Sequence, residues 1–224
     1  MTVTVTSPKT VSGLTGLFIG DSRIAPGVGI SASLPRAVAE RLPDVEWLGT
    51  QTNADGLRCE GWGGWRVSDL TVSKDGKNPF FDPDKKAFSF DYYCTQTGKR
   101  PDFAVICLGA NDLYSNNSAK QLRTIADAIA ATGTRVFVLT EYAIAPAEGC
   151  GFGDDLRSRL SFAYFDRLTA AFAGAETNGI YLIPNFLSVG LTDSDRADYI
   201  HLTAAGYAHE ADVIATYLDA VLGS

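Results

Sequence analysis

Short apolar runs that are typical of buried strands alternate with helical patterns along most of this chain. The strand-like runs cover residues 14–19, 45–48, 102–108, 135–140 and 180–183, and the helical patterns cover 34–42, 119–131, 156–172 and 203–222. In the second helical pattern, Leu122, Ile125 and Ile129 recur at the spacing that places side chains on one face of a helix. Strands separated by helices form βαβ units, so the sequence predicts an α/β fold with a parallel sheet covered on both faces.

Parallel sheets of this kind bind ligands at the carboxyl ends of their strands. Ser22 lies in the turn after the first strand, residues 109–112 follow the most apolar strand, and residues 141–142 follow the next one. His201 lies in the loop before the last helical pattern. We therefore expect these segments to meet at one rim of the sheet.

Ser22, Asp198 and His201 could supply the nucleophile, the orienting carboxylate and the base of acyl-transfer catalysis. A neutral serine hydroxyl is a weak nucleophile that needs a base, and the chain has only two histidines. His201 follows Asp198 by three residues, which is close enough for the carboxylate to fix the tautomer of the imidazole. His209 lies further along the last helical pattern, and we expect it to be a surface or packing residue. Each motif alone is common, and Gly-Asp-Ser also suits a simple turn ahead of a helix.

Two further segments hold groups that could stabilise an oxyanion. Asn111 follows the most apolar strand, where its side-chain amide either donates to a developing negative charge or merely belongs to a strand-ending turn. Residues 60–66 (E-G-W-G-G-W-R) hold three glycines in four positions, so this backbone can approach a ligand closely and donate an N–H. Trp62 and Trp65 accompany the glycines and are either core residues or platforms for a sugar ring.

The net charge limits the classes of partner. It is −7, from 19 lysines and arginines against 26 aspartates and glutamates, and no basic cluster interrupts the acidic excess. We therefore expect neither a nucleic-acid nor a membrane partner, whereas a neutral substrate is compatible. Residues 1–6 (M-T-V-T-V-T) lack the basic start and apolar run of a secretory signal peptide, so we expect none, and the cellular location stays open.

The cysteines and histidines do not predict a metal site. The four cysteines lack the spacing of metal ligands, and one of the two histidines already has a role, so we expect neither a metal nor an organic cofactor. Free thiols are favoured over a Cys59–Cys94 or a Cys94–Cys150 disulfide. Cys107 lies within the most apolar strand and is most simply a small buried hydrophobe.

Residues 73–100 interrupt the regular alternation with a segment rich in lysine, aspartate, proline and aromatic residues. This segment is too long for a simple connection. Phe88, Phe90 and Tyr92 alternate along it, which predicts a short β-hairpin packed on the domain. The hairpin either decorates the surface or lines a substrate cleft. We expect residues 1–224 to form one domain.

The four blocks occur in the order Gly-Asp-Ser, glycine block, Gly-x-Asn-Asp and Asp-x-x-His, and this order resembles the SGNH hydrolases, the GDSL-type esterase superfamily. The resemblance runs from Gly20 to His201, and the wording E-G-x-G-G-W is most similar to that of carbohydrate O-acetyl esterases. It implies a flavodoxin-like three-layer α/β/α sandwich with a five-stranded parallel sheet. Arg23 stands where the GDSL wording has leucine, and we expect this departure to leave the chemistry unchanged.

The same resemblance implies a role for a residue of each block. Ser22 would be the nucleophile and would also donate its backbone N–H to the oxyanion. The backbone N–H of Gly64 and the side-chain amide of Asn111 would add two further donors. Asp198 and His201 would complete the catalytic triad.

We predict a serine esterase that hydrolyses small acyl esters through an acyl-enzyme on Ser22, with O-acetyl groups of a carbohydrate as the expected substrate. Trp62, Trp65 and Tyr142 are the expected substrate contacts, and the oligomeric state stays open. One alternative is a lipase- or thioesterase-like acyl hydrolase, whose acyl channel the phenylalanine-rich segment 73–100 could form. Another alternative is a non-catalytic carbohydrate-binding or virion structural module, which would have no reason to keep all four blocks.

Overall fold

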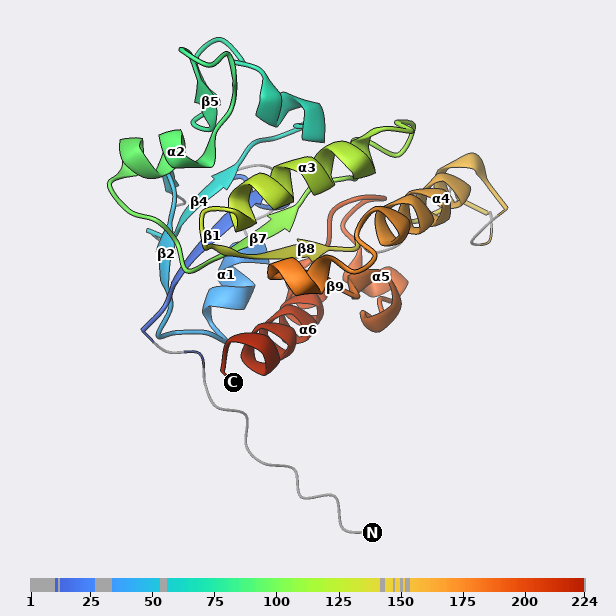
Figure 1. Ribbon diagram of the computed structural model, residues 1–224. Helices are drawn as coiled ribbons and strands as arrows, with labels where there is room; N and C mark the ends of the chain where they lie inside the picture. The colour runs from blue at the N-terminus through green and yellow to red at the C-terminus, as the bar shows by residue number, and fades with distance from the viewer. Residues whose placement is uncertain are drawn as a thin grey trace.

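The computed structural model describes residues 11, 13–26, 34–52, 56–141, 144–146, 148–149, 151 and 154–223. A central sheet is covered by helices on both faces (Figure 1). Its strands are β1 (Thr15–Gly20), β2 (Glu46–Leu48), β3 (Gln51–Thr52), β4 (Arg58–Gly61), β7 (Phe103–Cys107), β8 (Arg135–Leu139) and β9 (Ile180–Ile183). The helices are α1 (Leu34–Ala39), α2 (Phe90–Thr97), α3 (Ser118–Ala130), α4 (Leu156–Ala171), α5 (Asn185–Ser188) and α6 (Ala204–Leu222), with short 3₁₀ turns η1 (Val67–Thr71), η2 (Ala175–Asn178) and η3 (Asp193–Asp195).

The strand order of the sheet is β3-β4-β1-β7-β8-β9, and β2 also pairs with β1. Because β7 pairs with β1 from Gly16 to Gly20, β2 and β4 share the opposite edge of β1, one beside its start and one beside its end. In the described sheet, β3–β4 is antiparallel and the other pairs are parallel. With β2 and β4 counted as one position, five parallel positions follow the flavodoxin-like order, which confirms the predicted fold class.

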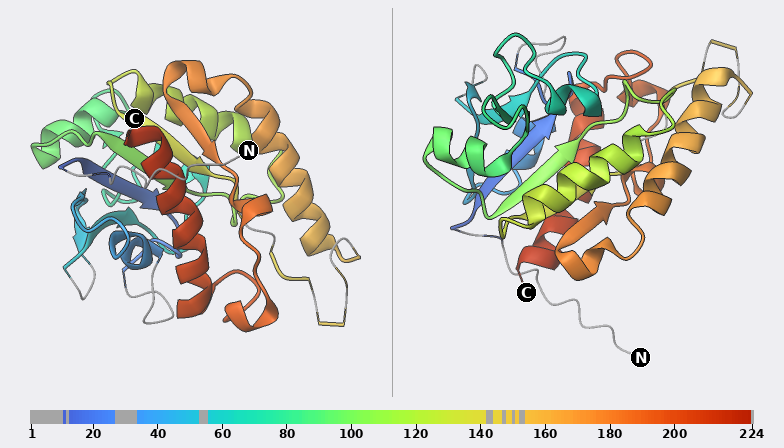
Figure 2. Two further views of the ribbon diagram at one scale, coloured as in Figure 1. Left: turned by 90° about the horizontal axis from the view of Figure 1, so that it is seen from below. Right: turned by 45° about the horizontal axis from the view of Figure 1, so that its top comes forward.

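Both faces of the central strands are buried. Leu17 and Ile19 of β1 pack in the core that α3 and α4 cover, whereas Phe18 packs in the core that α1 and α6 cover. In β7, Ile106 and Cys107 divide between the same two cores. The two helical layers can be followed in the views of Figure 2. Burial on both faces explains why these strands are continuous apolar runs rather than alternating ones.

The predicted elements agree with the observed ones to within three residues at each end, and the last helical pattern begins one residue before α6. The hydroxyl of Thr203 caps α6 by accepting the backbone N–H of Gly206 at 3.3 Å. The helices of the described chain include none with the length and apolar character that crossing a membrane requires. That residues 1–224 form a single domain stays a prediction.

The sequence analysis missed β3 and β4, because the segment R-C-E-G of β4 has no apolar run. Glu60 within β4 is wholly buried and accepts hydrogen bonds from the backbone N–H (2.5 Å) and the hydroxyl (2.9 Å) of Thr50. Burial raises the pKa of Glu60 to about 7, although the hydrogen bonds from Thr50 act in the opposite direction. A search for apolar runs therefore did not find β4, because one of the buried residues of this strand is a glutamate.

Residues 73–100 form a short hairpin followed by a helix. The hairpin strands β5 (Phe81–Asp82) and β6 (Ala87–Phe88) pair in antiparallel fashion. The alternation of Phe88, Phe90 and Tyr92 does not continue the strand, because the side chain of Ser89 caps α2 by accepting the N–H of Tyr92 at 3.2 Å. The predicted short hairpin is therefore present, but of the three alternating aromatic residues it includes only Phe88, and Phe90 and Tyr92 lie in α2.

The described cysteines are unpaired. Cys59, Cys94 and Cys107 are free thiols, whereas Cys150 lies outside the described residues. Complete burial raises the pKa of Cys107 well above its usual value. This thiol therefore behaves as the small buried hydrophobe that its strand predicts.

Candidate active site

Ser22 lies in a tight turn at the carboxyl end of β1. The N–H groups of Ile24 and Ala25 both donate to the carbonyl oxygen of Asp21, at 3.0 and 2.9 Å, which closes the turn around Ser22. A Cβ at Gly20 would lie 2.3 Å from the side chain of Ile24 and 2.8 Å from the backbone of β7, so only glycine fits there. The backbone N–H of Ser22 donates to no partner within the described chain and is available to a ligand.

Ser22, His201 and Asp198 form a continuous chain of contacts. The Oγ of Ser22 lies 2.8 Å from Nε2 of His201, and Nδ1 of His201 lies 2.8 Å from Oδ2 of Asp198. Oδ1 of Asp198 accepts the backbone N–H groups of Ile200 (2.7 Å) and His201 (2.6 Å). Burial acts to raise the pKa of Asp198, but the hydrogen bonds from His201 and Ile200 outweigh it and hold this pKa below its usual value. The carboxylate is thus kept ionised and oriented, and the ring presents Nε2 to Ser22.

The loop that holds Asp198 and His201 is a closed turn. The N–H groups of Ala197 (2.9 Å) and Asp198 (3.3 Å) both donate to the carbonyl oxygen of His201. From outside the turn, the N–H of Ala145 donates to the carbonyl oxygen of Tyr199 at 3.1 Å. These bonds fix the position of the imidazole relative to the loop that follows β8.

His209 lies apart from this arrangement. Its ring is 56% exposed, and its Nδ1 lies 3.2 Å from Oδ1 of Asp195 rather than near Asp198. His209 is therefore a surface residue of α6, as its position in the sequence predicts.

Two further segments border the nucleophile turn, and they hold Gly64 and Asn111. The N–H of Trp62 donates to the carbonyl oxygen of Gly20 at 3.0 Å, which lays the glycine segment against the end of β1. Gly64 has a φ of +74°, a backbone conformation that favours glycine, and its N–H has no partner among the described residues. Nδ2 of Asn111 donates one hydrogen to the carbonyl oxygen of Trp65 at 3.0 Å and has no second partner among the described residues, so its other hydrogen can be donated to a ligand.

Asp112, which the sequence analysis gave no role, links these two segments. Oδ2 of Asp112 accepts the N–H of Val67 at 3.1 Å, which ties the start of η1 to the segment that holds Asn111. Asp112 is 4% exposed, and burial raises its pKa to about 6. Asp112 is the last residue of the Gly-Ala-Asn-Asp block that the sequence analysis singled out. Its role was missed because its partner Val67 comes near only in the folded chain.

The expected substrate contacts differ in exposure. The rings of Trp62 and Trp65 stack with centroids 4.9 Å apart. Trp65 is 6% exposed and belongs to the core, so it supports Trp62, which is half-buried. Tyr142 lies outside the described residues. The role of these three residues in substrate binding stays a prediction.

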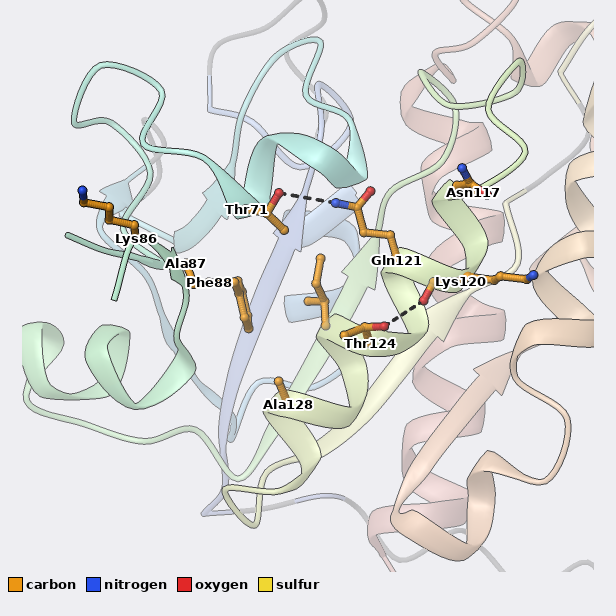
Figure 3. Close-up of a pocket in the computed structure, with 10 residues that line it drawn as sticks. Thr71, Lys86, Ala87, Phe88, Asn117, Lys120, Gln121, Thr124 and Ala128 are labelled. Carbon is orange, nitrogen blue, oxygen red and sulfur yellow. Dashed lines mark hydrogen bonds between the residues drawn. The ribbon is translucent and has the colours of Figure 1, made fainter. Parts of the chain in front are cut away.

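A pocket of about 710 Å³ lies between the hairpin and α3 (Figure 3). Phe88 of the hairpin and Thr124 of α3 stand on opposite sides of it, and Gln121 donates to the hydroxyl of Thr71 across its upper edge at 3.4 Å. The remaining lining residues are Lys86, Ala87, Asn117, Lys120, Ile125 and Ala128. The described residues that line this pocket include no carboxylate. Among the residues that the structure describes, no group of three or more His, Cys, Asp or Glu side chains is arranged to hold a metal ion.

Comparison with known proteins places the chain among ester hydrolases. The model of the GDSL-like lipase/acylhydrolase family matches residues 18–209. A family 3 carbohydrate esterase of Clostridium thermocellum superposes with a TM-score of 0.68 at 17% identity, covering 94% of this chain and 97% of that chain. A family 3 carbohydrate esterase of Talaromyces cellulolyticus has a TM-score of 0.62 at 18% identity and covers 94% and 98% of the two chains. An acetylxylan esterase of Geobacillus stearothermophilus has a TM-score of 0.60 at 17% identity, with 92% and 94% covered.

Identities this low establish a shared fold and nothing finer. No curated protein matches the chain in sequence.

Proposed function

Because the chain belongs to the GDSL-like lipase/acylhydrolase family and is a carboxylic ester hydrolase, we propose that it removes acetyl groups from a carbohydrate through an acyl-enzyme on Ser22. The observation that carries this proposal is the Ser22–His201–Asp198 chain, with both contacts at 2.8 Å. A serine hydroxyl in contact with an imidazole that a carboxylate orients is the arrangement of serine hydrolases on several unrelated folds.

Each group has a defined task in the proposed reaction. Nε2 of His201 takes the proton of Ser22 as its Oγ attacks the ester carbonyl, and Asp198 stabilises the imidazolium that forms. The oxyanion accepts hydrogen bonds from the backbone N–H groups of Ser22 and Gly64 and from Nδ2 of Asn111. His201 then gives its proton to the leaving alcohol. Water, activated by the same imidazole, attacks the acetyl-enzyme and releases acetate with the free Ser22 hydroxyl.

A carbohydrate alcohol is the leaving group that the surroundings of the site favour. Trp62 is a half-buried aromatic residue within the glycine segment, and aromatic rings stack on the apolar faces of sugars. The net charge of −7 suits a neutral substrate. The structures with the same fold that are described as carbohydrate esterases and as an acetylxylan esterase add support.

The test is hydrolysis of p-nitrophenyl acetate and of an acetylated xylo-oligosaccharide by the wild type and by Ser22→Ala. We expect the wild type to release acetate from both esters and Ser22→Ala to lose about 10⁴-fold or more in kcat with its fold intact. His209→Ala, on the surface of α6, is the matched control and should keep its activity. A Ser22→Ala variant with wild-type activity would rule out the proposed nucleophile.

A second candidate is an acyl hydrolase for longer chains, whose acyl group would lie in the pocket of Figure 3 against its apolar members Phe88, Ile125 and Ala128. For an acetyl esterase, rates on p-nitrophenyl esters should fall steeply from acetate to butyrate. Rates that rise toward octanoate, and that Ala128→Phe then reduces by filling the pocket, would instead support the second candidate. An unchanged profile in Ala128→Phe would exclude this pocket as the acyl site.

A further inference from the structure

Arg23, the residue directly after Ser22, is buried with its charge (2% exposed). Its Nε and Nη2 donate to the two carboxylate oxygens of Asp21, at 2.9 and 2.7 Å. Nη2 also donates to Oε1 of Glu141 at 2.9 Å, and Nη1 contacts the other oxygen of Glu141. A guanidinium stays protonated at any ordinary pH, so these two carboxylates are its counter-ions inside the protein.

Glu141 is held in an unfavourable backbone conformation. It lies shortly after β8, is 6% exposed and has a φ of +40°, in the left-handed region that residues other than glycine rarely adopt. Such a conformation persists only where the surroundings hold it in place. The contacts with the fork of Arg23 supply that constraint.

A residue shortly after Glu141 contacts the loop that holds the imidazole. Four residues further on, Ala145 donates its N–H to the carbonyl oxygen of Tyr199 at 3.1 Å. Tyr199 lies between Asp198 and His201 in the sequence. Arg23 is therefore joined directly to Ser22 on one side and, by way of Glu141 and Ala145, to the loop of His201 on the other.

We propose that Arg23 is a positioning residue that, through Glu141, sets the distance between Oγ of Ser22 and Nε2 of His201. This inference rests on the proposed function, since it assigns Arg23 a part in the same reaction. A displacement of about 1 Å between reacting groups can cost about 100-fold in rate. The alternative is an ion pair that stabilises the fold and has no influence on the site.

The substitution that separates these two roles is Arg23→Lys. Lysine keeps the charge, but one ammonium group cannot hold two carboxylates in the planar fork geometry of a guanidinium. We expect kcat for p-nitrophenyl acetate, per titrated active site, to fall by about 10–100-fold with KM within a few-fold. Phosphonylation of Ser22 by a fluorophosphonate should slow by a similar factor. Glu141→Gln, which keeps the acceptor oxygen and loses the charge, should show a smaller loss of the same kind.

The matched control is Arg123→Lys. Nε of Arg123 donates to both oxygens of Asp127 at 2.9 and 3.0 Å, and Nη1 donates to the carbonyl oxygen of Ala171, so this arginine also joins two segments of the chain. It lies on α3, and these two partners belong to α3 and α4 rather than to the nucleophile turn. We expect Arg123→Lys to keep the wild-type kcat and phosphonylation rate.

A purely structural ion pair would give a different result in the same experiment. Arg23→Lys and Glu141→Gln would then lower the melting temperature and leave kcat per active site unchanged, which would overturn the proposal. A crystal structure of Arg23→Lys that keeps the 2.8 Å contact between Ser22 and His201 would overturn it as well. A wild type that neither hydrolyses the ester nor reacts with the fluorophosphonate would refute the proposed function, and the crystal structure would then decide the positioning role by itself.

Discussion

Glu210 offers a prediction about stability that the charges around it define. This residue lies on α6 with no exposed surface, and its Oε1 accepts a hydrogen bond from Nδ2 of Asn185 at 2.5 Å. Burial raises its pKa from 4.5 to about 7. The positive charge of Arg23 and the hydrogen bond from Asn185 oppose this rise, and the negative charge of Asp21 adds to it.

The sign follows from the direction of the shift. The folded protein holds the proton of Glu210 up to about pH 7, whereas the unfolded chain releases it near 4.5. The contribution of Glu210 to stability is therefore fully present below pH 4.5 and is lost as the pH rises through about 7. From these two pKa values, the contribution of Glu210 to the free energy of unfolding falls by about 2.5 kcal/mol between about pH 5 and about pH 8.

The perturbation is Glu210→Gln, which keeps an oxygen to accept from Asn185 and removes the titration. Its free energy of unfolding, measured with urea, should rise relative to that of the wild type by about 2.5 kcal/mol between about pH 5 and about pH 8. For a chain of this length, that corresponds to a relative change of roughly 5–10 °C in melting temperature. The two proteins share every other titrating group, so the contributions of those groups to the pH dependence cancel in the difference. A difference between wild type and variant that stays constant with pH would refute the reasoning, because it would mean that Glu210 is ionised at no cost in the folded protein.

Two further predictions concern the reaction. Asn111→Ala should lower kcat for p-nitrophenyl acetate by roughly 10²–10³-fold with little change in KM, because an oxyanion donor acts mainly in the transition state; a loss confined to KM would make Asn111 a contact of the bound substrate instead. His201→Ala should remove nearly all activity while His209→Ala keeps kcat/KM within a few-fold, as measured on the same ester with circular dichroism to verify folding; an inactive, folded His209→Ala would contradict the assignment of the base.

Local features of the sequence were sufficient to predict the buried strands of the sheet and the residues of the candidate site. Leu17, Phe18 and Ile19 belong to an unbroken apolar run, and such a run is the mark of a strand buried on both faces. The pairing of Asp198 with His201 spans three residues, so one closed turn is enough to form it. Patterns of this kind are visible in a sequence because the interactions that produce them lie within a few residues of one another.

Other features depend on contacts between residues that are far apart in the sequence. Ser22 and His201 are 179 positions apart, and their 2.8 Å contact exists because parallel strands bring their carboxyl ends to one rim. The burial of Arg23 was not predicted from the sequence, since one of its two counter-ions, Glu141, is 118 positions away. The strand β4 was likewise missed, because its buried residue Glu60 is polar and the strand holds no apolar run. Polar residues buried in pairs were the ones that sequence reasoning missed, because an unpaired charge is too costly inside a protein and only the folded chain supplies its partner.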